Sequence, residues 1–215
     1  MYNWFLNDSN FTWSDRLKIC KFFLDPKNRW TQDKYVLEYE DKWKEYTGAK
    51  YALMVSSGST ANTLIAQYAH EKGVIYSSNK KYKCKLVPFK NEVIFPSITW
   101  QTSVSPWINA GFDPKFIDVN LKDFSIDINK LSDDLKNNHK KVNTVFVTSL
   151  IGITPDIPRL KKVCSNYNVD LKLDNCENSF GAYIDEDTKD LKHICSELTS
   201  STSTYFGHQT TTGSE

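Results

Sequence analysis

Two carboxylates, Asp174 and Glu177, stand where an apolar run gives way to a turn. Asp174 ends the strand-like part of LKLDNCENSFGA, residues 171–182, and Glu177 follows three residues later. A carboxylate at a strand end can pair with a protonated ring nitrogen and stabilise its charge, and Glu177 can then reach a neighbouring hydroxyl. The pair equally fits a helix N-cap followed by an acidic first turn. The two residues alone leave both interpretations open.

A second motif, SSGSTA at residues 56–61, lies between an apolar run and a helical pattern. Gly58 is expected to let the backbone turn tightly, and the amides that follow begin a helix. Free N–H groups and the positive end of the helix dipole favour a phosphate there, with Ser59 and Thr60 as hydroxyl donors. A helix cap built from small residues is the competing interpretation.

Two further motifs contribute an aromatic ring and an imidazole. Trp100, in SITWQTS (97–103), can stack on a planar ligand, although an isolated Trp is more commonly a core or interface residue. Ser203 and His208 lie five residues apart in STSTYFGHQTTTG (201–213). His208 suits proton transfer near neutral pH, and a solvated surface His is its plainer interpretation.

Alternating helices and strands are expected to position these side chains. Helical periodicity and capping residues predict helices at 14–25, 35–48 (ending at Gly48), 99–111, 128–138 and 157–168, and a small-residue turn followed by a helix at 56–73. A continuous apolar run predicts a buried strand at 51–55, and further strands are expected at 91–95, 115–119, 142–149 and 169–175. The polar stretch at 74–90 is expected to be a surface loop.

This alternation predicts an α/β fold around a mainly parallel sheet. Ligands of such sheets bind beyond the carboxyl ends of the strands. The phosphate motif, Trp100 and Asp174 each follow a predicted strand, so we expect them to meet at that edge.

Composition argues against several classes of protein. The 215 residues are 40% hydrophobic and 25% charged, and the net charge of +1 gives no basic field for nucleic acid or anionic lipid. No apolar run has membrane-spanning length, and the N-terminus does not resemble a signal peptide. Five cysteines without a CxxC pair predict reduced thiols and a cytoplasmic location, with no metal or iron–sulfur site.

Taken together, the four motifs resemble the fold type I pyridoxal-phosphate enzymes. Within them, the chain resembles the DegT/DnrJ/EryC1/StrS sugar aminotransferase family, in the stretches YALMVSSGSTANTL, VIFPSITWQTSVSPWINAGFDPKFIDV, TSLIGITPDIPRL and LKLDNCENSFGA. The resemblance implies the three-layer α/β/α large domain of aspartate aminotransferase-like enzymes. It places an N-terminal helical segment at 1–33 and the cofactor domain at 34–215.

The resemblance also implies a role for each motif residue. Gly58, Ser59, Thr60 and Ser203 would bind the cofactor phosphate. Trp100 would stack on the pyridine ring, Asp174 would pair with its nitrogen, and Glu177 would lie near its 3-hydroxyl. Most aminotransferases of the family carry, five residues after the position of Ser203, a Lys that is covalently bound to the cofactor. Here the position is His208, and no Lys follows Lys192.

The Lys-to-His exchange is similar to that of the GDP-4-keto-6-deoxymannose 3-dehydratase subgroup. It implies a pyridoxamine 5'-phosphate cofactor, a nucleotide-linked 4-keto-6-deoxy sugar as substrate, His208 as base and glutamate as amino donor. A sugar aminotransferase, as in polysaccharide biosynthesis, and a non-catalytic remnant are the alternatives. Family chains continue well past this segment, so we expect the N-terminal part of a longer, homodimeric protein.

Overall fold

The computed structural model describes residues 12–29, 31–78, 90–205 and 208–209. Its centre is a five-stranded sheet in the order β2-β1-β3-β4-β7, with every neighbouring pair parallel. The strands are β1 (Glu92–Pro96), β2 (Asp113–Ile117), β3 (Val142–Thr148), β4 (Asp170–Asp174) and β7 (Ser200–Ser201). This confirms the predicted α/β fold with a parallel sheet.

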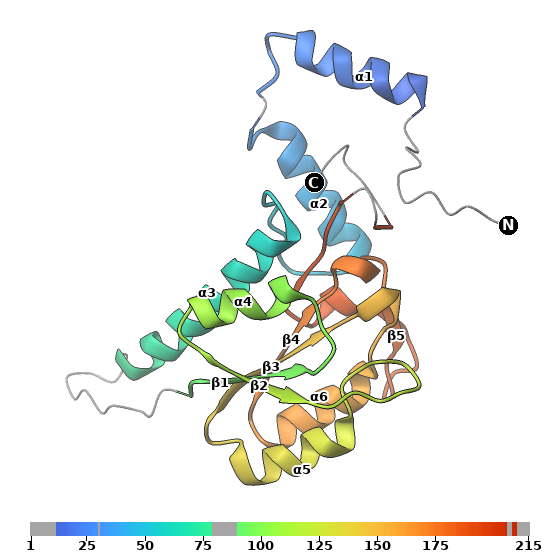
Figure 1. The fold of residues 1–215 in the computed structure, drawn as a ribbon. Helices are drawn as coiled ribbons and strands as arrows, with labels where there is room; N and C mark the ends of the chain where they lie inside the picture. Colours follow the sequence, from blue (N-terminus) through green and yellow to red (C-terminus); the bar gives the residue numbers. More distant parts are fainter. Residues whose placement is uncertain (1–11, 30, 79–89, 206–207, 210–215) are drawn as a thin grey trace, which may run out of the picture.

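Helices cover both faces of the sheet (Figure 1). One layer contains α3 (Gly58–Ser78) and α4 (Gln101–Asn109), and the other contains α5 (Ile128–Asn138) and α6 (Ile157–Asn166). Successive residues of β1 face opposite layers, because Val93 and Phe95 join one buried cluster whereas Ile94 joins the other. Burial on both faces explains why β1 and β3 are mainly apolar along their whole length. The result is the expected three-layer arrangement.

Two helices precede this core. In α1 (Trp13–Leu24), Thr12 and Asp15 form a capping box, and no residue of the helix is buried. The helix α2 (Lys34–Thr47) ends at Gly48, whose left-handed φ of 72° confirms the predicted C-cap. A cluster of aromatic contacts joins α2 to the segment around a small antiparallel hairpin, β5 (Ala182–Ile184) and β6 (Leu191–His193), which the sequence did not predict.

The strand predicted at residues 51–55 is wrong. This segment belongs to neither sheet, and its Tyr51 and Leu53 side chains are 79% and 70% exposed. The Met54 N–H donates to the Glu40 carboxylate of α2. A cavity of about 580 Å³, lined by 49–55 on one side and 195–204 on the other, separates the segment from the sheet edge at β7. None of the strands in the described part of the chain pairs with it.

Other boundaries differ by a few residues. The helix predicted at 56–73 runs from Gly58 to Ser78, into the stretch expected to be a loop, and residues 79–89 of that stretch lie outside the described part. The helix predicted at 99–111 runs from Gln101 to Asn109 and contains Pro106. Within the described ranges, the structure has no helix that is both long and apolar enough to cross a membrane.

Candidate active site at the carboxyl end of the sheet

Asp174 is the last residue of β4 and is 4% exposed. Its Oδ2 accepts hydrogen bonds from Asn62 Nδ2 at 2.7 Å and Ser103 Oγ at 2.6 Å. Its Oδ1 accepts from the Cys176 N–H at 3.2 Å and lies 3.3 Å from Ser201 Oγ. Donors from α3, α4 and β7 therefore surround one buried carboxylate, as a buried charge requires.

Asn62 and Ser201 form a second layer of this cluster. Ser201 Oγ donates to Asn62 Oδ1 at 2.6 Å, and Asn62 Nδ2 also donates to the Thr102 carbonyl at 3.1 Å. Sequence reasoning missed Asn62, Ser103 and Ser201. In the sequence they are single small polar residues, and only the fold brings them to Asp174.

The N-terminus of α3 carries a cluster of hydroxyl groups. The Ser57 carbonyl accepts from the Ala61 N–H, and its Oγ accepts from the Thr60 N–H at 3.2 Å, so Ser57 is the helix cap. Thr60 Oγ1 lies 3.0 Å from both Ser56 Oγ and Ser57 Oγ. Ser59 follows at the second helical position and is exposed. The first amides of a helix have no intrahelical acceptor, which leaves donors for an anion beside these hydroxyls.

Gly58 has a different role from the one expected. It does not have positive φ, so the turn does not need its conformational freedom. A Cβ at this position would lie 2.6 Å from Cys176 Sγ and 3.4 Å from Ser203 Cβ. Glycine is required because α3 begins in contact with the segments that follow β4 and β7. This approach also places Ser203 beside the start of α3.

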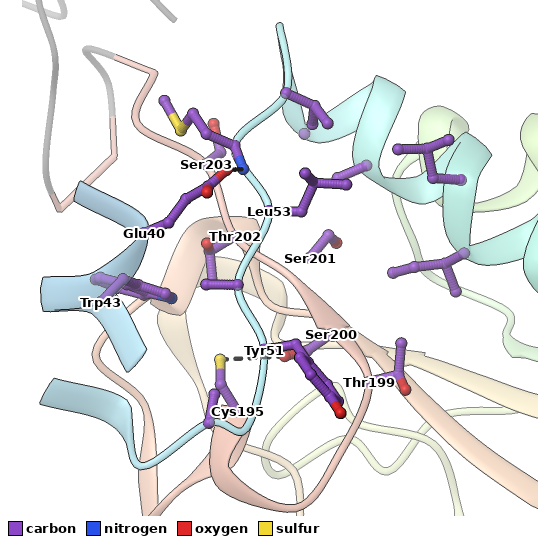
Figure 2. A pocket seen from close by; sticks show the side chains of 18 of the residues that line it. Glu40, Trp43, Tyr51, Leu53, Cys195, Thr199, Ser200, Ser201, Thr202 and Ser203 are labelled. Atoms are coloured by element: carbon purple, nitrogen blue, oxygen red, sulfur yellow. Dashed lines mark hydrogen bonds between the residues drawn. The ribbon is translucent and has the colours of Figure 1, made fainter. Parts of the chain in front are cut away.

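Ser203 is 6% exposed and is held by local contacts. Its Oγ accepts from the Tyr205 N–H at 3.1 Å, and its carbonyl accepts from Ser179 Oγ. Figure 2 shows Ser201, Ser203 and Leu53 among the side chains that line one cavity, and Gly58 lines the same cavity. One continuous surface therefore joins the α3 N-terminus to β7.

Trp100 is the residue that precedes α4, and its side chain is 62% exposed. Its carbonyl accepts from the Ser103 N–H, so it lies one turn from the residue that donates to Asp174. The core interpretation of this Trp is therefore wrong. Its exposed ring is available to stack on a planar ligand.

Glu177 lies in the short helix η2 (Cys176–Asn178). Its Oε2 accepts from the Ile151 N–H at 2.5 Å, within the turn that follows β3. Ile151 has a φ of +49°, which is uncommon for a β-branched residue. The carboxylate thus fixes a strained turn and keeps Oε1 for another donor.

His208 is placed at the far end of the Ser203 segment. Its backbone N–H donates to the Tyr205 carbonyl. The imidazole and the Tyr205 ring meet edge to face, with their centroids 5.4 Å apart. Its buried Nδ1 has no hydrogen-bond partner among the described residues. The next residue, Gln209, accepts from the Phe180 N–H. These contacts attach the His208 segment to the turn after η2.

Burial sets the state of the nearby thiols. Burial raises the pKa of Cys176, and the charge of Asp174 raises it further; burial also raises the pKa of Cys195. These groups therefore stay protonated at neutral pH and are poor nucleophiles. In the part of the chain that the structure describes, no group of His, Cys, Asp and Glu side chains is arranged to hold a metal ion.

The donor set fits pyridoxal 5'-phosphate. A buried carboxylate, an exposed indole and a hydroxyl-rich helix N-terminus suit the ring nitrogen, ring face and phosphate of such a cofactor. The fold and this set of groups define the class of aminotransferase-type pyridoxal-phosphate enzymes, in which the comparisons place the chain.

The model of the DegT/DnrJ/EryC1/StrS aminotransferase family matches residues 22–215, so the chain belongs to that family. The chain is similar to the GDP-4-keto-6-deoxy-D-mannose 3-dehydratase of Yersinia pseudotuberculosis, with 31% identity over 172 residues, which is 80% of this chain and 40% of the relative. It is also similar to the dTDP-3-amino-3,6-dideoxy-alpha-D-galactopyranose transaminase of Aneurinibacillus thermoaerophilus, with 26% identity over 67% of this chain and 34% of that one.

Solved structures agree with this assignment. The E. coli GDP-4-keto-6-deoxy-D-mannose-3-dehydratase with bound hydrated PLP superposes with a TM-score of 0.67 and 27% identity, covering 88% of this chain and 44% of that one. The chain spans about 40% of the length of the two curated dehydratases it matches. The expectations of family and fold are thereby confirmed.

Proposed function

We propose that this chain is the cofactor-binding part of a nucleotide-sugar-modifying enzyme and holds pyridoxal or pyridoxamine 5'-phosphate. The observation that carries the proposal is the Asp174 carboxylate, buried at the end of β4 and held by Asn62 and Ser103. The cofactor domain would span residues 34–215, behind the helical segment at 1–33. Free thiols at Cys20, Cys164, Cys176 and Cys195 support a reducing, cytoplasmic location.

Each site residue has a role in this proposal. Gly58, Ser59, Thr60 and Ser203 bind the phosphate, with Gly58 allowing the close approach of the chain. The Trp100 ring covers one face of the pyridine. Asp174 binds the protonated ring nitrogen, which makes the ring a better electron acceptor. Glu177 uses the oxygen that Ile151 does not occupy to contact the ring hydroxyl.

The reaction we propose is removal of the 3-hydroxyl from a nucleotide-linked 4-keto-6-deoxy sugar. When bound as the amine, the cofactor supplies a nitrogen that condenses with the sugar ketone and a ring that accepts electrons. His208 removes a proton from the carbon beside that nitrogen and then protonates the departing hydroxyl. Imidazole can move protons in this way but forms no stable covalent link to an aldehyde.

The atoms and electrons balance if glutamate is the amino donor. Replacing a C–OH group by CH₂ is a two-electron reduction of the sugar. Glutamate supplies these electrons: with one water it becomes 2-oxoglutarate and ammonia, while the sugar hydroxyl leaves as water, so that no net water is formed. We also propose that the full-length protein is a homodimer, as the family resemblance implies.

A second function, amino transfer to the sugar, is favoured by the similarity to the Aneurinibacillus transaminase. It lacks support at position 208, where the sequence has His and no Lys follows. The two reactions leave different products: dehydration removes one oxygen atom and keeps the ketone, whereas transamination keeps the 3-hydroxyl and replaces the ketone oxygen by an amine.

The test has two stages. Absorbance and fluorescence titrations first measure binding of pyridoxamine 5'-phosphate to the purified chain, with the Asp174→Asn variant as control. The chain is then mixed with that cofactor, glutamate and a GDP-linked 4-keto-6-deoxy sugar, and mass spectrometry follows the sugar. Loss of one oxygen supports the dehydratase. Net amino transfer with a retained 3-hydroxyl contradicts it, and absence of cofactor binding supports a non-catalytic remnant.

A further inference from the structure

The two oxygens of Asp174 have unequal hydrogen-bond partners. Oδ2 accepts two short bonds, from Asn62 Nδ2 at 2.7 Å and Ser103 Oγ at 2.6 Å. Among the hydrogen bonds of the described residues, Oδ1 has the longer ones, from the Cys176 N–H at 3.2 Å and Ser201 Oγ at 3.3 Å, and the weakly donating Cys176 thiol also interacts with this carboxylate. A carboxylate oxygen can accept about two hydrogen bonds, so Oδ2 is fully used.

The contact of Ser201 with Oδ1 is weaker than its distance suggests. A serine hydroxyl has one hydrogen to donate. Ser201 Oγ lies 2.6 Å from Asn62 Oδ1 and 3.3 Å from Asp174 Oδ1, so the hydrogen goes to Asn62. Asp174 Oδ1 is then left with the Cys176 amide and room for one further donor.

Asn62 determines this distribution. Its amide is 1% exposed and uses both N–H bonds, one to Asp174 and one to the Thr102 carbonyl, while its carbonyl accepts from Ser201. The opposite orientation of the amide would put its oxygen against the Asp174 carboxylate and its N–H groups against the Ser201 hydroxyl. Only the observed orientation gives every group a complementary partner.

We propose that Asn62 is a positioning residue for the cofactor site. It binds Asp174 Oδ2 and holds the Ser201 hydrogen away from Oδ1, so that Oδ1 is reserved for the N–H of the protonated pyridine ring. This inference rests on the proposed function, because it assumes that a pyridine cofactor binds at Asp174.

Removal of the Asn62 amide has two effects on Asp174. Oδ2 loses one donor, and the released Ser201 hydrogen can turn to Oδ1, where it competes with the ring nitrogen. The variant Asn62→Ala is therefore expected to lower the pKa of the bound ring nitrogen and to weaken pyridoxamine 5'-phosphate binding about tenfold. In Asn62→Ala/Ser201→Ala the competing hydroxyl is absent, so part of both losses should be recovered.

The experiment uses the complete 215-residue chain with pyridoxamine 5'-phosphate labelled with ¹⁵N in the ring. The ¹⁵N chemical shift, followed against pH, reports protonation of that nitrogen, and fluorescence titration reports Kd. Asn138→Ala is the matched control, because Asn138 Nδ2 also donates to a carboxylate, that of Asp134, on the other face of the sheet. Circular dichroism checks that each variant folds.

The outcomes separate this inference from the proposed function. A shifted ¹⁵N titration in Asn62→Ala, with partial recovery in the double variant and none of either change in Asn138→Ala, supports it. If wild type binds the cofactor and Asn62→Ala titrates as Asn138→Ala does, Asn62 has no positioning role and the proposed function stands. If wild type does not bind the cofactor, both fail.

A second variant keeps the test decisive should Asn62→Ala not fold. In Ser201→Ala the two short bonds to Oδ2 remain, so the ring nitrogen is expected to titrate as in wild type. A shift in Ser201→Ala would mean that the Ser201 hydrogen lies on Asp174 Oδ1, which would overturn the assignment of that oxygen to the cofactor.

Discussion

Asn62 Nδ2 lies 2.7 Å from Asp174 Oδ2, although the two residues are 112 positions apart in the chain. The bond joins α3, which begins at the candidate phosphate site, to the strand end that carries the candidate ring-nitrogen contact. Because Asn62 also contacts Thr102 and Ser201, one buried amide connects four segments of the site. The candidate phosphate site and the candidate ring-nitrogen contact are therefore fixed relative to each other through the core.

Replacement of Asp174 by Asn is expected to weaken pyridoxamine 5'-phosphate binding. The variant loses the charge that pairs with the ring nitrogen. Its new NH₂ group must also face another hydrogen-bond donor, either Asn62 Nδ2 or the Cys176 N–H. We expect a Kd about 10- to 100-fold higher, measured by fluorescence titration. Asp133→Asn, on the exposed surface of α5, is the control. An unchanged Kd in Asp174→Asn would place the ring elsewhere.

Gly58→Ala is expected to destabilise the protein by about 1–3 kcal/mol, because the new methyl group would lie 2.6 Å from Cys176 Sγ. Urea unfolding followed by circular dichroism measures the loss. The added methyl also separates the start of α3 from Ser203, so phosphate binding should weaken in the same variant.

Cys176→Ala provides the rescue for that variant. Cys176 Cβ is 3.8 Å from the position of the added methyl, an ordinary contact, so only the sulfur must be removed. In Gly58→Ala/Cys176→Ala most of the lost stability should return, relative to Cys176→Ala alone. A double variant as unstable as the sum of the single ones would show that the sulfur is not the obstacle.

Much of the fold could be predicted because β1, β3 and the carboxyl end of β4 are buried on both faces, whereas the edge strand β2 is largely exposed. Their continuous apolar runs, separated by amphipathic helices, are a local signal, and Asp174 at the end of one run could be found in the same way. The run at 51–55 gives the same signal without being a strand. An apolar segment becomes a strand only if another strand lies beside it to form hydrogen bonds. The local sequence does not specify that neighbour.

The supporting residues of the site could not be found from the sequence for a related reason. In the sequence, Asn62 cannot be distinguished from an Asn on the exposed face of a helix. Its hydrogen-bond partners lie 40, 112 and 139 positions away in the chain. Ser201 lies in a two-residue strand within a Ser- and Thr-rich stretch that has no apolar pattern. Ligand-binding motifs can be found by their residue types and spacing. The residues that support them can be found only once the packing of the fold is known.

Position 208 provides a test of where the cofactor aldehyde would lie. If His208 occupies the place of the family's Lys, His208→Lys should form a covalent bond with pyridoxal 5'-phosphate. Reduction with borohydride followed by peptide mass spectrometry should locate the adduct at residue 208. Gln209→Lys is the matched control, because Gln209 points to Asn178 and Phe180. An adduct in the control alone would exclude His208 as the base.

The ion-pair network at Glu197 predicts a pH dependence of stability. A hydrogen bond from Lys161 and a second one from Lys192, which has a smaller effect, lower the Glu197 pKa from its ordinary value of 4.5 to about 2. Since folding lowers this pKa, the stabilisation is complete above about pH 4.5 and is lost as the pH falls through about 2. The side chain is 32% exposed, and solvent screening reduces the effect.

Glu197→Gln should therefore cost about 1 kcal/mol of unfolding free energy at pH 7, and less as the pH is lowered toward 2. Urea unfolding at several pH values measures the difference between the variant and wild type. Glu71→Gln, an exposed residue of α3, controls for loss of one negative charge. A difference that stays constant between pH 7 and pH 2 would show that the Glu197 charge does not stabilise the fold, and that the substitution acts through packing around Tyr183, whose hydroxyl also donates to Glu197.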